Sequence, residues 1–220
     1  MSDTDSFIEE VSEEVRRDRL YGLFRRYAWI GVVAVVVLVG GAAANEWRKA
    51  RAEAQAQALG DALFAALSDG TPEARAAALA GVAADGAASD IVALLLAAER
   101  LAADEPGAAA EVLRPLAQDA DAPVVYSDLA ALKLAMLGED GVDAQTRAQL
   151  LERLAAPGAP YRILALEQQA YAALASGERE AALSAAQALW QEQGLTQSLR
   201  QRLAQFILAL GGELPQQSAG

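Results

Sequence analysis

Two pairs of adjacent carboxylates, Asp104 with Glu105 and Glu139 with Asp140, are the side chains best placed to do chemistry in this sequence. Paired carboxylates can serve as general acid and general base. Each pair stands beside a proline or a glycine that breaks a helical pattern, where acidic residues are expected as helix caps. The pairs therefore predict helix ends rather than a catalytic site.

The composition removes most other reactive sites. None of the 220 residues is His or Cys, which excludes zinc, haem and iron–sulfur ligation by the usual ligands and also Cys–His or Ser–His–Asp catalysis. Asp119, Asp121, Asp140 and Asp143 do not complete a calcium loop, and no glycine-rich phosphate loop occurs. We predict a protein that is not an enzyme, with no catalytic, cofactor-binding or metal-binding residues, no cofactor and no small-molecule substrate.

The charge is divided unevenly along the chain. Residues 1–51 hold 8 basic and 8 acidic side chains, whereas residues 52–220 hold 10 basic and 22 acidic ones, which is the whole net charge of −12. A binder of nucleic acid needs a basic face for the phosphates, so this balance argues against nucleic acid as a partner. The split itself indicates two regions that face different surroundings.

A stretch of 19 uncharged residues, 27–45, predicts a transmembrane helix over 27–47. A helix of that length spans about 28 Å, close to the roughly 30 Å thickness of the hydrocarbon core. Tyr27 and Trp29 mark one end and Trp47 the other, as interfacial aromatic residues do. Gly40 and Ala44 form a small-xxx-small pair that would let another helix approach closely. We expect these five residues to belong to a membrane anchor in contact with the lipid bilayer.

Two other interpretations of this stretch are weaker. A buried helix of a soluble protein rarely runs so far without a polar break. A cleaved signal peptide would find a cleavage site of small residues at 42–44, but the 26 residues before the stretch are too many and too acidic for the charged region of such a peptide.

The basic residues near the two ends predict the orientation, because cytoplasmic flanks are enriched in Lys and Arg. Five precede the stretch and three follow it: Arg16, Arg17, Arg19, Arg25 and Arg26, then Arg48, Lys49 and Arg51. This bias favours a single-pass protein of the inner (plasma) membrane with a cytoplasmic N-terminus and a periplasmic C-terminal domain. Residues 1–26 are expected to form a cytoplasmic amphipathic helix, since Phe7, Val11 and Val15 recur at helical spacing.

Residues 48–211 show apolar stripes at helical spacing throughout and no alternating strand pattern. Long stripes start near Ile91, Val125, Ile163 and Leu199, and shorter helices are expected around 109–116, 144–155 and 180–190. Pro115 lies inside one of these and is expected to end or kink it. Residues 212–220 are expected to be a disordered tail.

The alternation of long and short helices suggests a repeat. Pro123 and Pro160 each precede a long helix and are 37 residues apart, close to the 34 residues of a tetratricopeptide repeat. Residues 177–183, GEREAAL, fit the turn pattern of that repeat, with small residues at Ala170 and Ala186 where paired helices cross. The fold class we predict is all-α: one N-terminal transmembrane helix followed by a tetratricopeptide-like solenoid of helix pairs, with 195–210 as the capping helix. A compact helical bundle with accidental spacing is the alternative.

This layout, together with FIEEVSEEVRRDRLYGLFRRY before the span and NEWRKARAEAQAQALGDALFAAL after it, resembles the YfgM-type family of ancillary SecYEG translocon subunits. The resemblance implies an inner-membrane protein whose periplasmic domain works with a membrane-bound chaperone/isomerase beside the translocon. It carries over no catalytic residues.

The leading hypothesis is therefore a membrane-tethered interaction module that recruits periplasmic chaperones and helps newly translocated proteins. Its groove would be lined by the first helix of each pair, with Glu99, Arg100, Lys133 and Gln168 as candidate partner contacts. The alternative is a scaffold for another envelope complex, in respiration, cytochrome maturation or cell division. The architecture alone does not separate the two, and the identity of the partner does.

Overall fold

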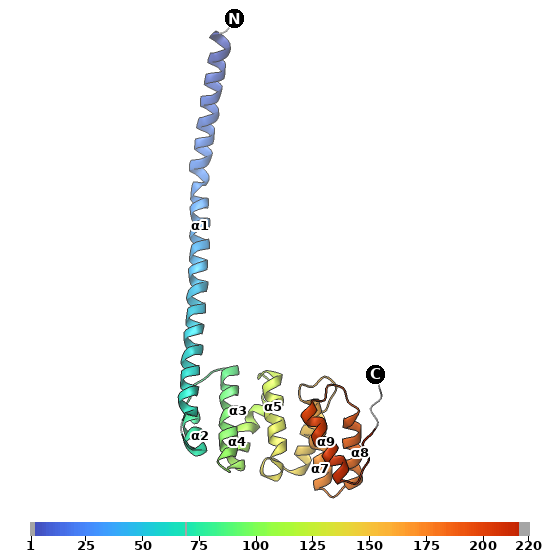
Figure 1. Cartoon of the computed structure of the whole chain (residues 1–220). Helices are drawn as coiled ribbons and strands as arrows, with labels where there is room; N and C mark the ends of the chain where they lie inside the picture. Colours follow the sequence, from blue (N-terminus) through green and yellow to red (C-terminus); the bar gives the residue numbers. More distant parts are fainter. Residues whose placement is uncertain (1–2, 69, 216–220) are drawn as a thin grey trace. The chain divides into compact units, whose positions relative to one another are not determined.

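The computed structural model describes the backbone of residues 3–68 and 70–215, and side chains from Trp29 onward except those of Val32, residue 69 and residues 216–220. Within these residues the chain is all-helical and contains no strand, as the stripes predict. Figure 1 shows the helices in chain order. Their bounds are α1 Asp3–Leu67, α2 Pro72–Ala80, α3 Ala87–Ala102, α4 Pro106–Gln118, α5 Val124–Met136, the 3₁₀ turn η1 Gly138–Asp140, α6 Ala144–Leu154, α7 Arg162–Ala175, α8 Arg179–Trp190 and α9 Gln197–Ala209.

The chain divides into two units, residues 1–58 and residues 59–220. Helix α1 accounts for the described part of the first unit and continues into the second. It passes without a break through positions 26 and 47, where the sequence predicts segment boundaries. No proline lies within α1, so its backbone hydrogen bonds continue through both positions. The changes of composition there affect which environment each part of the helix favours.

In the second unit each helix packs mainly on its neighbours in sequence, and α3 also contacts α5. The core consists of two clusters. The larger joins α3 to α7 around Leu113, Leu151 and Leu154, and the smaller joins α7, α8 and α9 around Leu203 and Ile207. Alanines without any exposed surface fill the helix crossings of both clusters, among them Ala109, Ala130, Ala165 and Ala186. Small side chains let the helices approach closely, which explains how an alanine-rich sequence builds a core.

Local sequence signals set several helix starts. Thr71, Asp143 and Thr196 each accept a hydrogen bond from the backbone N–H three residues later, at 3.3, 2.9 and 3.2 Å. These contacts satisfy N–H groups that have no partner within the helix. Pro72 and Pro106 occupy the first helical position, where the missing N–H costs nothing.

Of the two outcomes expected at Pro115, an end or a kink of the helix, the end does not occur. Helix α4 runs through Pro115 to Gln118. The proline removes a single N–H in the last turns, while Leu113, Leu116 and Ala117 on either side of it are buried. Packing of this face outweighs the local cost.

Two residues of the expected disordered tail, Glu213 and Pro215, form hydrogen bonds with α8. Gln187 Nε2 donates to the carbonyl oxygen of Glu213 at 3.0 Å, and Trp190 Nε1 donates to that of Pro215 at 3.1 Å. Residues 212–215 thus lie along α8. The sequence pattern places Gln187 and Trp190 on a helix but does not predict these contacts. Residues 216–220 of the predicted tail lie outside the described residues.

Candidate membrane anchor and interaction surface

The apolar stretch of α1 is exposed on all sides. Every described side chain from Trp29 to Asn45 is exposed, including Val37 and Leu38 at 67% and 73%. The helix is long and apolar enough here to cross a membrane, and it is the one candidate span among the described residues. A helix that is apolar all round needs an apolar environment, and its backbone hydrogen bonds are satisfied internally as a bilayer requires.

The predicted anchor residues are distributed along this helix. Trp29 and Trp47 are 63% and 64% exposed, and the guanidinium carbon of Arg51 lies 5.6 Å from the centroid of the Trp47 ring. This is cation–π geometry, typical of an aromatic ring beside charged groups at an interface. Tyr27 is part of α1, but its side chain is not among those that the structure describes.

Gly40 and Ala44 present an open surface. A Cβ built on Gly40 would meet no atom within 4 Å in the part of the chain that the structure describes, and Ala44 is exposed. The close approach of a second helix at this pair stays a prediction.

Two of the predicted partner contacts are engaged inside the chain. Arg75 Nη2 lies 2.7 Å from Glu99 Oε2, which ties α2 to α3. Arg100 Nη1 lies 2.6 Å from Glu105 Oε2, which ties α3 to the turn that follows it. Because both side chains already have a partner of opposite charge, a binding partner would gain little from either alone.

The other two predicted contacts lie on separate helices, Lys133 on α5 and Gln168 on α7, and both are half-buried. In the described part of the chain Lys133 forms no ion pair. The four predicted contacts therefore come from three helices, α3, α5 and α7.

The carboxylate pairs lie at helix ends. Glu139 and Asp140 form the exposed turn η1, and Asp104 lies in the turn after α3 with a φ of 58°. Asp143 accepts hydrogen bonds from the Thr146 side chain at 2.6 Å and from its N–H at 2.9 Å. These bonds lower the pKa of Asp143. Among the described residues no group of three or more acidic side chains could hold a metal ion.

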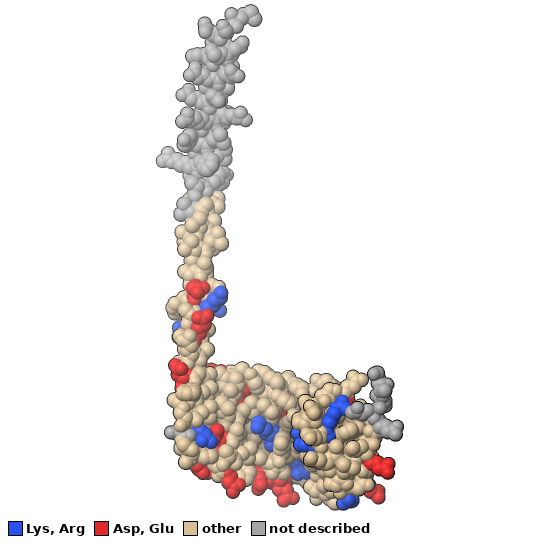
Figure 2. Space-filling view, in the orientation of Figure 1, with Lys and Arg blue, Asp and Glu red and all other residues tan. Residues whose placement is uncertain are grey.

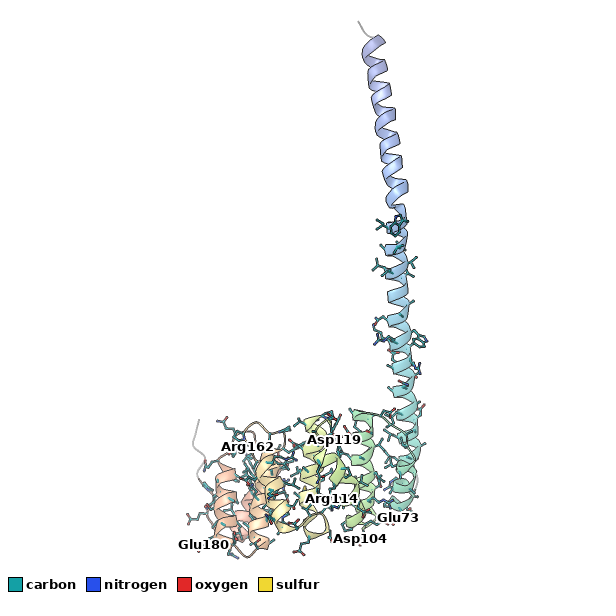
Figure 3. All side chains as sticks on the ribbon, turned by 180° about the vertical axis from the view of Figure 1, so that it is seen from behind. Glu73, Asp104, Arg114, Asp119, Arg162 and Glu180 are labelled. Atoms are coloured by element: carbon teal, nitrogen blue, oxygen red, sulfur yellow. The ribbon has the colours of Figure 1, made fainter. Side chains whose placement is uncertain are left out.

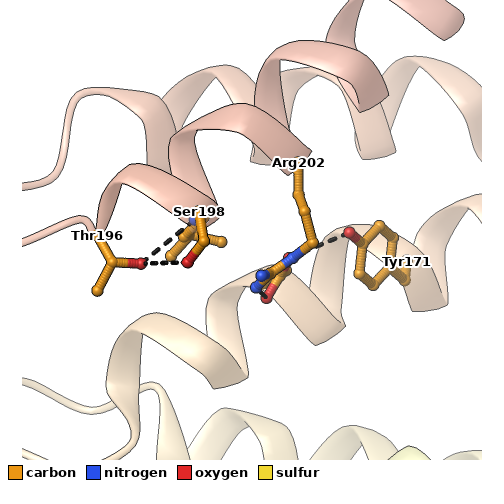
Figure 4. A network of polar contacts seen from close by, with 6 residues as sticks. Tyr171, Thr196, Ser198 and Arg202 are labelled. Carbon is orange, nitrogen blue, oxygen red and sulfur yellow. Dashed lines mark hydrogen bonds and ion pairs between the residues drawn. The ribbon is translucent and has the colours of Figure 1, made fainter.

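Sequence reasoning missed a polar network around a buried carboxylate that joins α7 to α9, shown in Figure 4. Glu167 is 3% exposed. Arg202 Nε and Nη2 donate to its two oxygens at 2.9 Å each, and the Tyr171 hydroxyl donates to Oε1 at 3.1 Å. The Tyr171 ring meets Phe206 edge-on at a centroid distance of 4.9 Å. The sequence could have predicted only the contact between Glu167 and Tyr171, which are one helical turn apart. Arg202 lies 35 residues after Glu167, so its contact could not be predicted from spacing.

The network shifts the acidity of its members. The hydrogen bonds and charge of Glu167 raise the pKa of Arg202, and burial followed by the negative charge of Glu167 raises the pKa of Tyr171. These directions keep the guanidinium charged and the phenol neutral, which suits a structural clamp. The arrangement fastens the last helix to the unit.

A shallow hollow of about 440 Å³ lies between α3 and α4. Ala93, Val112 and Leu116 line it together with Asp90 and Asp119. None of the predicted contact residues lines this hollow.

The chain matches no protein-family model, no curated protein and no solved structure.

Proposed function

We propose that this chain is a membrane-anchored, non-enzymatic interaction module, an accessory subunit of the Sec translocon. It is held in the inner membrane by α1, with its N-terminus in the cytoplasm and its helical unit in the periplasm. There it recruits a membrane-bound chaperone/isomerase and assists newly translocated proteins. The helical unit acts as a tetratricopeptide-like solenoid in which α3 with α4, α5 with α6, and α7 with α8 are the helix pairs.

The observation that carries this proposal is the fully exposed apolar stretch of α1, bounded by Trp29 and Trp47 and followed by a helical unit. A tether of this kind holds an interaction domain at the membrane surface and raises its effective concentration for partners there. The packing of successive helices and the contact of α3 with α5 support the solenoid interpretation. The translocon assignment rests on the sequence resemblance.

The test is co-isolation from native membranes. The tagged full chain is crosslinked lightly, extracted in mild detergent and analysed by mass spectrometry beside membranes that carry the untagged chain. Enrichment of translocon subunits and a periplasmic isomerase is expected. A reproducible set of partners that lacks them, from respiration, cytochrome maturation or division, would overturn the translocon assignment in favour of the scaffold alternative.

A further inference from the structure

The exposed large apolar side chains of the helical unit are confined to alternate helices. Between residues 70 and 209, the described ones all lie on α3, α5, α7 and α9: Ile91, Val124, Val125, Met136, Leu164, Leu174 and Leu208. In that described range α2, α4, α6 and α8 expose none. Surface apolar residues scattered singly need no explanation, but their restriction to one set of helices indicates a common surface.

Spacing and contacts bring four of these positions together, with the half-buried Leu129 among them. On α5, Val125, Leu129 and Met136 follow each other at intervals of four and seven residues, so they share one side of the helix. Helix α3, which carries Ile91, contacts α5 directly. The Tyr161 hydroxyl donates to the carbonyl oxygen of Val125 at 3.1 Å, which brings the start of α7 and its Leu164 beside α5. We call Ile91, Val125, Leu129, Met136 and Leu164 the odd-helix face.

The charged side chains on these helices are largely neutralised inside the chain. Glu99 of α3 pairs with Arg75, Arg162 of α7 with Glu192 at 2.7 Å, and Arg202 of α9 with Glu167. Lys133, eight residues after Val125, adds one cation on the same side of α5. The odd-helix face is therefore apolar and carries little net charge.

An acidic edge borders the helices of this face at their C-terminal ends. Helices α3, α5 and α7 each end at a turn with exposed carboxylates, namely Asp104, Glu139 with Asp140, and Glu178. Figure 2 shows acidic side chains gathered along one edge of the helical unit, the lower edge in that view. Figure 3 places Asp104 and Glu180 on this edge and Asp119 and Arg162 on the opposite one. The C-terminal ends of the helices add their own partial negative charge there.

We propose that the odd-helix face binds an amphipathic polypeptide segment of a partner protein, whose apolar side chains cover Val125, Met136 and Leu164 and whose Lys or Arg residues lie over the acidic edge. The inference rests on the proposed function and names the chemistry of the partner. Charge complementarity selects this occupant. A second copy would bring an identical acidic edge with it, and residues 52–220 already carry the whole net charge of −12.

The test uses the full chain in nanodiscs of zwitterionic lipid. The probe is a fluorescent synthetic helix with a leucine stripe and three lysines at one end, and binding is read by anisotropy against empty nanodiscs. Met136→Gln with Leu164→Gln is expected to weaken binding by tenfold or more, since hot-spot truncations cost roughly this much. Glu139→Lys with Asp140→Lys is expected to weaken it similarly and to reduce its dependence on salt.

Two matched controls isolate the surface. Leu214→Gln changes an exposed apolar residue of the tail, and Glu152→Lys changes an exposed carboxylate on α6. Both are expected to stay within about twofold of the parent chain, since substitutions outside the binding surface change affinity little. All variants are checked for unchanged helicity and thermal unfolding. Equal loss in the controls, or equal binding of a probe with glutamates in place of its lysines, would overturn the proposal.

The two proposals can fail separately. If the probe does not bind the parent chain while translocon subunits still co-isolate with it, the odd-helix face is not the docking surface and the proposed function stands. If the probe binds as expected while the co-isolated proteins belong to another pathway, the surface stands and the translocon assignment falls.

Discussion

Glu167 is the most deeply buried carboxylate that the structure describes, and its two oxygens are held by Arg202 and Tyr171. Glu167→Gln keeps the shape and removes the charge, so one donor of Arg202 meets an amide that no longer attracts it. We expect a loss of about 1–2 kcal/mol in the free energy of unfolding, a moderate figure because Arg202 is half-exposed and screened by water. Urea unfolding of the detergent-solubilised full chain, with Trp29 and Trp47 changed to phenylalanine and followed by Trp190 fluorescence, measures it. Glu152→Gln on α6, exposed to solvent, is the matched control and should change stability by less than about 0.5 kcal/mol.

Tyr171 gives the network a dependence on alkaline pH. Burial and the charge of Glu167 raise its pKa, so the folded state favours the neutral phenol. The stability that this preference contributes is complete below the unfolded pKa of about 10 and is lost as the pH rises through the folded pKa. Tyr171→Phe should therefore flatten the fall in urea midpoint between pH 9 and pH 11. Part of the fall should remain, because burial also raises the pKa of Tyr161. An unchanged slope would show that ionisation of Tyr171 does not contribute to the fall in stability.

At the scale of elements, the turn between α5 and α6 leaves no room for a side chain at Gly141. A Cβ on Gly141 would clash with the carbonyl oxygen of Leu134 and lie 2.8 Å from Leu137 Cβ. Gly141→Ala must displace backbone and is expected to cost about 1–3 kcal/mol. Gly107→Ala in the first turn of α4 meets nothing within 4 Å in the described residues and should be neutral or raise stability by up to about 1 kcal/mol. Thermal unfolding of the two variants side by side compares them. Similar melting temperatures would contradict the clash.

The elements themselves were largely predictable, because each helix carries its apolar stripe and its caps within its own residues. The helices expected over 109–116, 144–155 and 180–190 appear as α4, α6 and α8 with bounds shifted by at most three residues. What failed was decided by contacts between distant segments. Burial of Leu113 and Leu116 carries α4 through Pro115, and Gln187 and Trp190 of α8 hold residues 213 and 215.

The candidate site was less predictable than the fold. Charged residues on a first helix, such as Glu99 and Arg100, resemble free contacts in the sequence, yet both meet partners of opposite charge that spacing alone does not reveal. The apolar positions that remain exposed, such as Met136 and Val125, belong to stripes that the sequence assigns to a core. Which residue of a stripe stays uncovered depends on how neighbouring helices cross, and that is a property of the assembled unit.

For the whole molecule, the predicted orientation gives a direct test. A reporter that is active only in the periplasm, fused after Gly220, is expected to be active, because five basic residues before the apolar stretch against three after it favour a cytoplasmic N-terminus. When those five arginines are changed to glutamine, only the three basic residues after the stretch remain. The same periplasmic reporter should then lose activity. Activity of a reporter that works only in the cytoplasm, fused at the same position of the parent chain, would contradict the predicted orientation.

The three tryptophans give the molecule a built-in optical readout. Trp29 and Trp47 flank the apolar stretch, whereas Trp190 lies on α8 with its indole N–H bonded to the tail at Pro215. With Trp29 and Trp47 changed to phenylalanine, the emission of the chain reports the far end of the helical unit alone. With Trp190 changed instead, quenching by brominated lipids reports the depth of the helix ends. The first variant would thus report folding of the helical unit, and the second would report membrane insertion.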